Sequence, residues 1–177
     1  MASRDQNIQT VTNAAYAIGV PVEIALAQAQ RESSFNDRAV GRDGERGLMQ
    51  PLPSTWAGVM PGYSFDQAFD PETNLLFWQK YFISLLNQFG WDYRNALIAY
   101  NGGPGHLTNP GKYGPPSSGA INYANAILNA AGWGNAAANV PNIPDTATSA
   151  SNTQSGLFWP VAIGMGALIF LFLTGDD

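Results

Sequence analysis

The chain has 177 residues, of which 45% are hydrophobic and 12% are charged, and its formal net charge at pH 7 is −5. This length suits one packed domain with an appendage and is too short for two ordinary domains. There is no basic surplus, no cysteine and only one histidine, His106. These absences exclude a basic nucleic-acid-binding surface, a disulfide framework and a multi-histidine or thiolate metal site, so we expect no nucleic-acid partner, no metal and no cofactor.

The first two predicted elements are helices. Ser3 and Gln6 match a capping box ahead of apolar residues at helical spacing, and this first helix ends at Gly19. A second helix is predicted over 22–33, which places Glu32 near its C-terminal end. The helix dipole disfavours a negative charge there, and partial burial adds to that effect. Both raise the pKa of a carboxyl and favour the protonated form that a general acid needs.

Segment 35–60 is predicted to be irregular because glycines, prolines and charges interrupt it, with a short β-hairpin around 41–44 as an alternative. Asp70 then starts a long helix that ends at Gly90. Its apolar stripe includes Trp78 and Phe82. Such stripes are usually core, so we assign neither residue a functional role.

Two more helices complete the predicted domain. Asp92 caps the first of them, which breaks at 101–104 and so presents Tyr100 and Asn101 at a helix end, where they can face a ligand. The last helix contains apolar residues at helical spacing over 121–128 and stops at Gly132. The fold class predicted for residues 1–133 is therefore all-α.

The C-terminal part of the chain predicts a tether and a membrane anchor. Residues 134–156, rich in Asn, Ala, Ser, Thr and Pro, indicate a flexible linker. Residues 157–174 carry no charge, and as a helix at about 1.5 Å per residue they would span ~27 Å, close to the roughly 30 Å of a bilayer core. We predict a transmembrane helix there and a polar tail over 175–177. The alternative is a buried helix of the main domain.

Three blocks of sequence carry the candidate chemistry, together with a later Tyr123. The blocks are Glu32-Ser33, Gly47-Leu48-Met49-Gln50 and Ala99-Tyr100-Asn101-Gly102-Gly103. In this order and spacing they resemble the four ordered motifs of the soluble lytic transglycosylase family, which is related in fold to goose-type lysozyme. The resemblance covers roughly residues 6–131, the whole predicted domain.

This resemblance implies a lysozyme-like all-α fold and an enzyme whose partner is the glycan strand of peptidoglycan. The family cleaves the β-1,4 bond between N-acetylmuramic acid and N-acetylglucosamine and leaves a 1,6-anhydro sugar. Ordinary glycosidases use two carboxylates, whereas substrate-assisted enzymes need one. By the resemblance, Glu32 would protonate the leaving glycosidic oxygen while the substrate's N-acetyl carbonyl stabilises the anomeric cation. Glu32 would then take the proton of the C6 hydroxyl.

The resemblance gives substrate-binding roles to Ser33, Met49, Gln50, Tyr100, Asn101 and Tyr123. Ser33 would hydrogen-bond to substrate or to Glu32, and Met49 and Gln50 would line the floor of the cleft. The Tyr100 hydroxyl would orient the Glu32 carboxyl or help to stabilise charge, and its ring would pack on a sugar face. The plain alternatives are core packing for Met49 and Tyr123, helix capping for Asn101 and a polar helix end for Ser33.

The sequence departs from the family pattern at Glu45 and Pro51. Glu45, or Asp37 or Asp43 in the same segment, could supply a second carboxylate that activates water, although we expect these three as surface charges. A muramidase on the same fold is therefore one alternative function. A non-catalytic wall-binding or structural protein is another, and it would be indifferent to Glu32→Gln.

The site of action is predicted from the chain ends. The polar N-terminus lacks the apolar core of a secretory signal, while the predicted substrate lies outside the cytoplasmic membrane. We therefore expect a bacteriophage particle protein, anchored by its C-terminal helix in an internal virion membrane. A bacterial envelope protein inserted through the same helix is the alternative. No Lys or Arg flanks the segment, so its orientation is not predicted.

Overall fold

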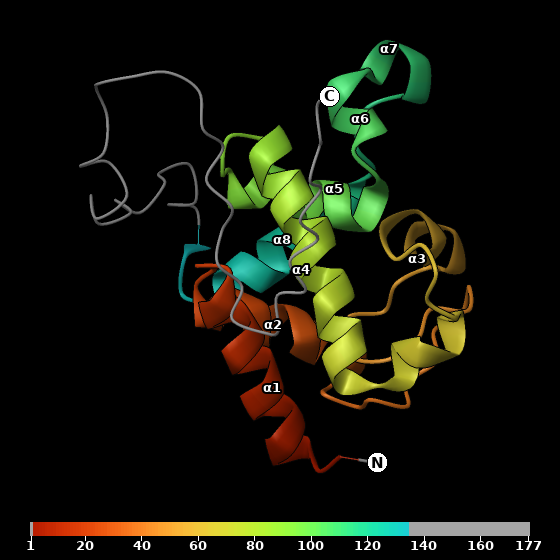
Figure 1. Ribbon diagram of the computed structural model, residues 1–177. Helices are drawn as coiled ribbons and strands as arrows, with labels where there is room; N and C mark the ends of the chain where they lie inside the picture. The colour runs from red at the N-terminus through yellow and green to blue at the C-terminus, as the bar shows by residue number, and fades with distance from the viewer. Residues whose placement is uncertain (1, 135–177) are drawn as a thin grey trace, which may run out of the picture. The chain divides into compact units, whose positions relative to one another are not determined.

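The computed structural model describes residues 2–134 of the chain, and these residues form an all-α domain with one isolated antiparallel bridge between Val40 and Arg46. The elements in chain order are α1 (Arg4–Ala17), α2 (Val22–Ser33), α3 (Pro53–Val59), the 3-10 helix η1 (Phe65–Phe69), α4 (Pro71–Gln88), α5 (Tyr93–Gly102), α6 (Gly105–Thr108), α7 (Pro110–Tyr113) and α8 (Ser118–Ala130) (Figure 1). The predicted helical fold class is confirmed.

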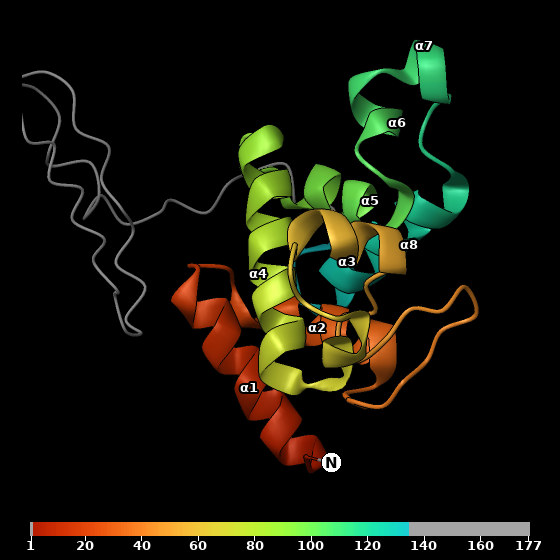
Figure 2. The same ribbon diagram turned by 45° about the vertical axis from the view of Figure 1, so that its right-hand side comes forward.

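Helix α4 is the central element of the domain, as the sequence predicts. The Asp70 side chain accepts the Thr73 N–H at 2.9 Å and so caps its first turn. Its apolar stripe is buried, and the Trp78 and Phe82 rings stack with their centroids 5.5 Å apart. Helices α1, α3 and α5 all pack on α4, which runs through the middle of the domain in both views (Figures 1 and 2).

Helices α2 and α8 form the part of the frame that matters for the site. The predicted start of α1 is confirmed by its Ser3 capping box, and α1 packs on α2. Helix α8 is capped by the Ser117 side chain and packs against both α5 and α2. Two chain segments that are distant in sequence, near residues 30 and 123, are thereby brought into contact.

Segment 35–60 is only partly irregular, so that prediction was wrong over α3. Pro53 lies in the first turn of this seven-residue helix, and Trp56 alone among its residues is buried. A helix this short gives no repeating apolar pattern, and the same reason applies to η1, α6 and α7, which the sequence did not predict. The alternative of a short hairpin around 41–44 is confirmed in minimal form: the antiparallel bridge between Val40 and Arg46 flanks this turn, and the Gly41 N–H donates to the Glu45 carbonyl at 2.8 Å.

The predicted linker 134–156, transmembrane helix 157–174 and tail 175–177 lie outside the described residues, except for Gly134. No helix within residues 2–134 is long and apolar enough to cross a membrane.

Candidate active site

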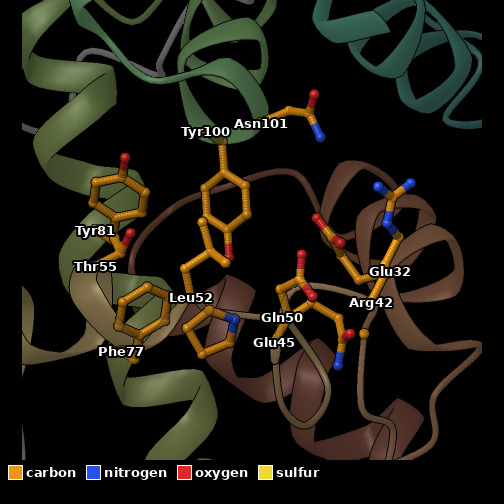
Figure 3. Close-up of a pocket in the computed structure, with 12 residues that line it drawn as sticks. Glu32, Arg42, Glu45, Gln50, Leu52, Thr55, Phe77, Tyr81, Tyr100 and Asn101 are labelled. Carbon is orange, nitrogen blue, oxygen red and sulfur yellow. The ribbon is translucent and has the colours of Figure 1, made fainter.

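An open pocket of about 180 Å³ lies between the C-terminal end of α2, helices α3, α4 and α5, and the loop over 41–52 (Figure 3). Tyr100 points from α5 into this pocket, with Glu32 on one side of it and Tyr81 and Phe77 of α4 on the other. The rest of the lining comes from Gly41, Arg42, Glu45, Gln50, Pro51, Leu52, Thr55 and Asn101. The structure therefore brings Glu32, Gln50, Tyr100 and Asn101 together as the sequence predicts.

Glu32 is placed at the pocket wall by the abrupt end of α2. Ser34 and Phe35 both have left-handed backbone conformations, with φ of 53° and 62°, which stop the helix directly after Glu32-Ser33. Such conformations cost of order 1 kcal/mol or more for residues other than glycine and persist where the surroundings hold them. The buried Asn7 side chain provides that hold, because its amide donates to the Phe35 carbonyl at 2.9 Å.

Glu32 as a residue is half-buried, and the burial of its carboxyl raises the pKa from 4.5 to about 7. The hydrogen bond from Tyr123 and the positive charge of Arg31 act in the opposite direction, while the charge of Glu45 raises the pKa further. The predicted increase is confirmed, with burial as the main cause. A carboxyl with a pKa near neutrality can hold a proton and release it under the same conditions.

Tyr123 holds the Glu32 carboxyl, and Tyr100 does not. The Tyr123 hydroxyl, on α8, donates to Glu32 Oε1, whereas the Tyr100 hydroxyl donates to the Met49 carbonyl at 2.8 Å. The prediction that Tyr100 orients the carboxyl was therefore wrong, because the packing of α8 on α2 brings the other tyrosine to Glu32. Arg31 covers the Tyr123 ring, with its guanidinium 5.4 Å from the ring centroid.

Met49 does not line the pocket, and its backbone is hydrogen-bonded to Tyr100 and Asn74. Its side chain is fully buried, so the prediction that it lines the cleft floor was wrong and the packing alternative holds. Its N–H donates to the buried Asn74 Oδ1 at 2.8 Å, and the Asn74 amide donates in turn to the carbonyls of Arg46 and Ala68 at 3.0 and 2.7 Å. Asn74 thus ties the loop to the start of α4.

Gln50 lines the pocket, and its amide nitrogen is already used. Nε2 donates to the Gly47 carbonyl at 2.8 Å and to the Ala39 carbonyl at 3.3 Å, and the residue itself has a φ of 48°. These bonds leave Oε1 to face the pocket near Gly41, where an added Cβ would lie only 2.8 Å from that oxygen. Gln50 is therefore fixed as an acceptor toward a ligand.

Of the predicted substrate-binding residues Ser33 and Asn101, only Asn101 lines the pocket. The Ser33 hydroxyl donates to the Ala29 carbonyl of its own helix at 3.3 Å, so the predicted hydrogen bond to Glu32 is not formed. A serine near a helix end has that carbonyl within reach one turn earlier. Asn101 is exposed at the rim of the pocket, where its contact with a sugar stays a prediction.

Of the three candidate second carboxylates, Glu45 alone lines the pocket. Its Oε2 accepts the Asp43 N–H at 2.9 Å, and Asp43 itself is exposed outside the pocket lining. Asp37 is not the surface charge that the sequence suggested. It is 2% exposed and accepts the Ala2 N–H at 3.0 Å, because the N-terminal segment covers it.

Sequence reasoning missed Gln28 and gave Trp78 no role beyond packing. Both side chains are fully buried and hydrogen-bonded to each other, and Gln28 also donates to Tyr123. The available signal was the position of Gln28 four residues before Glu32, which places both on one side of α2. Within residues 2–134, no three His, Asp, Glu or Cys side chains gather where they could hold a metal ion.

The sequence was compared with protein families and with curated proteins. The sequence profile described as "Transglycosylase SLT domain" matches residues 9–121, which is more than half of the chain. The chain belongs to the transglycosylase SLT family. Among curated SLT relatives, the soluble lytic murein transglycosylase of Escherichia coli K12 is 36% identical over 94 residues, which are 50% of this chain and 15% of that protein. The membrane-bound lytic murein transglycosylase C of Photorhabdus laumondii is 36% identical over 112 residues, 55% of this chain and 31% of that one.

The fold comparison leads to the same SLT family. The crystal structure of the 70 kDa soluble lytic transglycosylase from Escherichia coli superposes with a TM-score of 0.62 at 27% identity, over 71% of this chain and 23% of the other. The predicted lysozyme-like fold of the domain is thereby confirmed. The chain spans less than a third of each of these three relatives.

Proposed function

We propose that this SLT chain is a peptidoglycan lytic transglycosylase, which cleaves the β-1,4 bond between N-acetylmuramic acid and N-acetylglucosamine and forms 1,6-anhydromuramic acid. One observation carries the proposal. Glu32, whose pKa is about 7, lines an open pocket in a member of this family. The names of the curated relatives and of the solved structure support the same activity.

Glu32 can serve both proton transfers of this reaction. As a neutral acid it donates its proton to the glycosidic oxygen, and the bond from that oxygen to the anomeric carbon breaks. As the resulting carboxylate it accepts the proton of the C6 hydroxyl, whose oxygen bonds to the anomeric carbon and closes the anhydro ring. No water is consumed, and Glu32 returns to its neutral form. A pKa near the working pH favours a group that must perform both steps.

The pocket lining offers ring faces and polar groups that suit a sugar. Tyr81 and Tyr100 have ring centroids 5.3 Å apart and both line the pocket, with Tyr100 between Tyr81 and Glu32 (Figure 3). Aromatic rings pack well against the apolar faces of sugars while polar groups bind the hydroxyls. Gln50 Oε1 and the Asn101 amide are the polar groups that we assign to the hydroxyl and acetamido groups of the glycan.

A muramidase is the second candidate, and Glu45 is the observation that favours it. This carboxylate lines the same pocket, and its charge acts on Glu32. In that reaction Glu45 would accept a proton from water, and the water oxygen would bond to the anomeric carbon. The product would then carry a free reducing end, one water heavier than the anhydro product.

Mass spectrometry of digested sacculi tests the proposal. The full chain and its Glu32→Gln variant are incubated with purified sacculi, and the released muropeptides are weighed. Anhydro products from the unmutated chain alone support the transglycosylase. Hydrated products that disappear in Glu45→Gln would support the muramidase. Intact glycan from a folded chain would contradict both and support a binding or structural role.

We also propose that residues 157–174 anchor the domain to a membrane, with peptidoglycan as the other partner. The support is the uncharged 18-residue stretch, which as a helix would span ~27 Å, close to the thickness of a bilayer core. An internal virion membrane is the proposed location and the bacterial envelope is the alternative. Detection of the chain in purified virions, set against host envelope fractions, distinguishes them. Recovery in the soluble fraction of both, without detergent, would contradict the anchor.

A further inference from the structure

Three buried side chains from three helices form a hydrogen-bonded chain that ends on Glu32. The Trp78 indole donates to Gln28 Oε1 at 3.0 Å, Gln28 Nε2 donates to the Tyr123 oxygen at 3.1 Å, and the Tyr123 hydroxyl donates to Glu32 Oε1. Trp78 and Gln28 are fully buried, and Tyr123 is 4% exposed. A buried amide costs free energy unless it is hydrogen-bonded, and here both ends of the Gln28 amide have a partner.

The chemistry of the groups fixes the direction of every bond in this chain. An indole N–H can only donate, so the oxygen of the Gln28 amide must face Trp78. The amide nitrogen then faces Tyr123, and because it too can only donate, the Tyr123 oxygen must accept. The hydroxyl hydrogen of Tyr123 is left with one partner, Glu32. The indole at one end of the chain thus decides that Tyr123 donates at the other end.

We propose that Trp78 is a positioning residue of the reaction: by holding the Gln28 amide nitrogen toward Tyr123 it keeps Tyr123 a permanent donor to Glu32 Oε1 and leaves Oε2 as the oxygen that exchanges a proton with the substrate. This inference rests on the proposed function of Glu32. A carboxyl whose Oε1 already accepts a hydrogen bond carries its proton on Oε2. The proton is therefore on one defined oxygen when the substrate arrives, and no conformational search precedes its transfer.

Two opposing effects act on the pKa of Glu32 in this arrangement. Burial favours the neutral acid, and the bond from Tyr123 favours the ionised form, so the two act against each other. The other titratable groups that face Glu32 or share its pocket are Arg31, Arg42, Glu45, Tyr81 and Tyr100. The substitutions Trp78→Phe and Gln28→Met change none of these groups.

Two substitutions and their combination test whether the Trp78 indole fixes the direction of these hydrogen bonds. Trp78→Phe removes the donor that orients the amide, so Gln28 can turn its oxygen toward Tyr123 and draw the hydroxyl away from Glu32. Gln28→Met removes the amide at similar size and leaves Tyr123 free to donate to Glu32 alone. We expect Trp78→Phe to raise the midpoint of the Glu32 titration by about one pH unit, the scale of a hydrogen bond to a charged group. Gln28→Met should leave the midpoint close to its original value.

The double variant is the decisive measurement. Because Gln28 is the group that captures the hydroxyl when the indole N–H is lost, Gln28→Met should suppress the effect of Trp78→Phe and return the midpoint. If Trp78 and Gln28 only pack the core, either Trp78→Phe alone leaves the midpoint unchanged, or the double variant shifts it by the sum of the two single shifts. The inference is overturned if Trp78→Phe does not move the midpoint, or if the double variant moves it as far as Trp78→Phe alone.

The readout is the carbon-13 chemical shift of the Glu32 carboxyl in the full chain, assigned with Glu32→Gln and followed over pH. This measurement needs no substrate, so it tests the inference even if sacculi are not cleaved. Where cleavage is observed, the alkaline limb of the pH–rate profile should shift by the same amount as the titration midpoint of Glu32. If Trp78→Phe does not fold, benzothienylalanine at position 78 replaces the indole N–H by sulfur at nearly the same size and serves the same test.

Discussion

Replacement of Glu32 by glutamine is expected to stabilise the fold above pH 7. The folded chain holds the Glu32 proton up to a pKa of about 7, whereas an unperturbed carboxyl releases it at 4.5. Between these values the unfolded chain binds fewer protons than the folded chain, so the free energy of unfolding falls as pH rises. The loss begins near the lower value and is complete just above the higher one. The glutamine side chain of the variant stays neutral throughout and avoids this loss.

The magnitude follows from the two pKa values. The pKa rises from 4.5 to about 7, and each pKa unit corresponds to about 1.36 kcal/mol, which gives roughly 3–4 kcal/mol as an upper bound. Glu32 is half-buried, and the water that reaches it reduces this figure, so we expect about 1–3 kcal/mol. An amide oxygen at the same place still accepts the Tyr123 hydroxyl, so that bond is not lost.

Urea denaturation of the full chain at pH 4.5 and pH 8 measures this effect. The free energy of unfolding of Glu32→Gln, minus that of the unmutated chain, should be larger at pH 8 by the stated amount. Glu72→Gln is the matched control, because it makes the same chemical change at an exposed site outside the pocket. An equal difference at both pH values, or a Glu32→Gln variant less stable at pH 8 than at pH 4.5 relative to the unmutated chain, would refute the reasoning.

Three further substitutions have defined outcomes. Tyr123→Phe removes the bond that favours ionised Glu32, so the pKa of Glu32 and the alkaline limb of the cleavage rate should rise by about one to two pH units. Tyr100→Phe should leave that limb in place, because its hydroxyl bonds to a loop carbonyl, and should cost about 1–2 kcal/mol in urea denaturation. Gly47→Ala should cost more than about 3 kcal/mol, since φ is +75° and its Cβ would lie 2.0 Å from the Ala68 carbonyl oxygen.

Each of these predictions has a clear contrary result. Equal shifts of the alkaline limb in the two tyrosine variants would mean that both hydroxyls serve Glu32. For the glycine, Gly44→Ala is the matched control, because its φ is +87° and nothing lies within 4 Å of an added Cβ. If Gly44→Ala cost as much as Gly47→Ala, backbone strain and not the close approach to Ala68 would be responsible.

Most of the helices could be predicted because their signals are local. The Ser3 capping box, the Asp70 and Asp92 caps and the apolar stripe of α4 depend on residues within one or two turns of each other. The short helices α3, η1, α6 and α7 could not be predicted, because four to seven residues do not establish a period. For η1 the capping box of Ser64 and Gln67 was a local start signal that the sequence offered, but no apolar period followed it to indicate a helix.

The sequence by itself determined the candidate acid and the pocket residues Gln50 and Asn101, since their motifs carry a family resemblance that the comparisons support. Only the tertiary structure decided which tyrosine holds Glu32. Tyr123 lies 91 residues away, and its hydroxyl reaches the carboxyl because α8 packs on α2. The fixed direction of that bond depends on Gln28 of α2 and on Trp78 of α4, which meet only in the folded core. Hydrogen bonds act over about 3 Å, so partners that only packing brings together leave no pattern in the sequence.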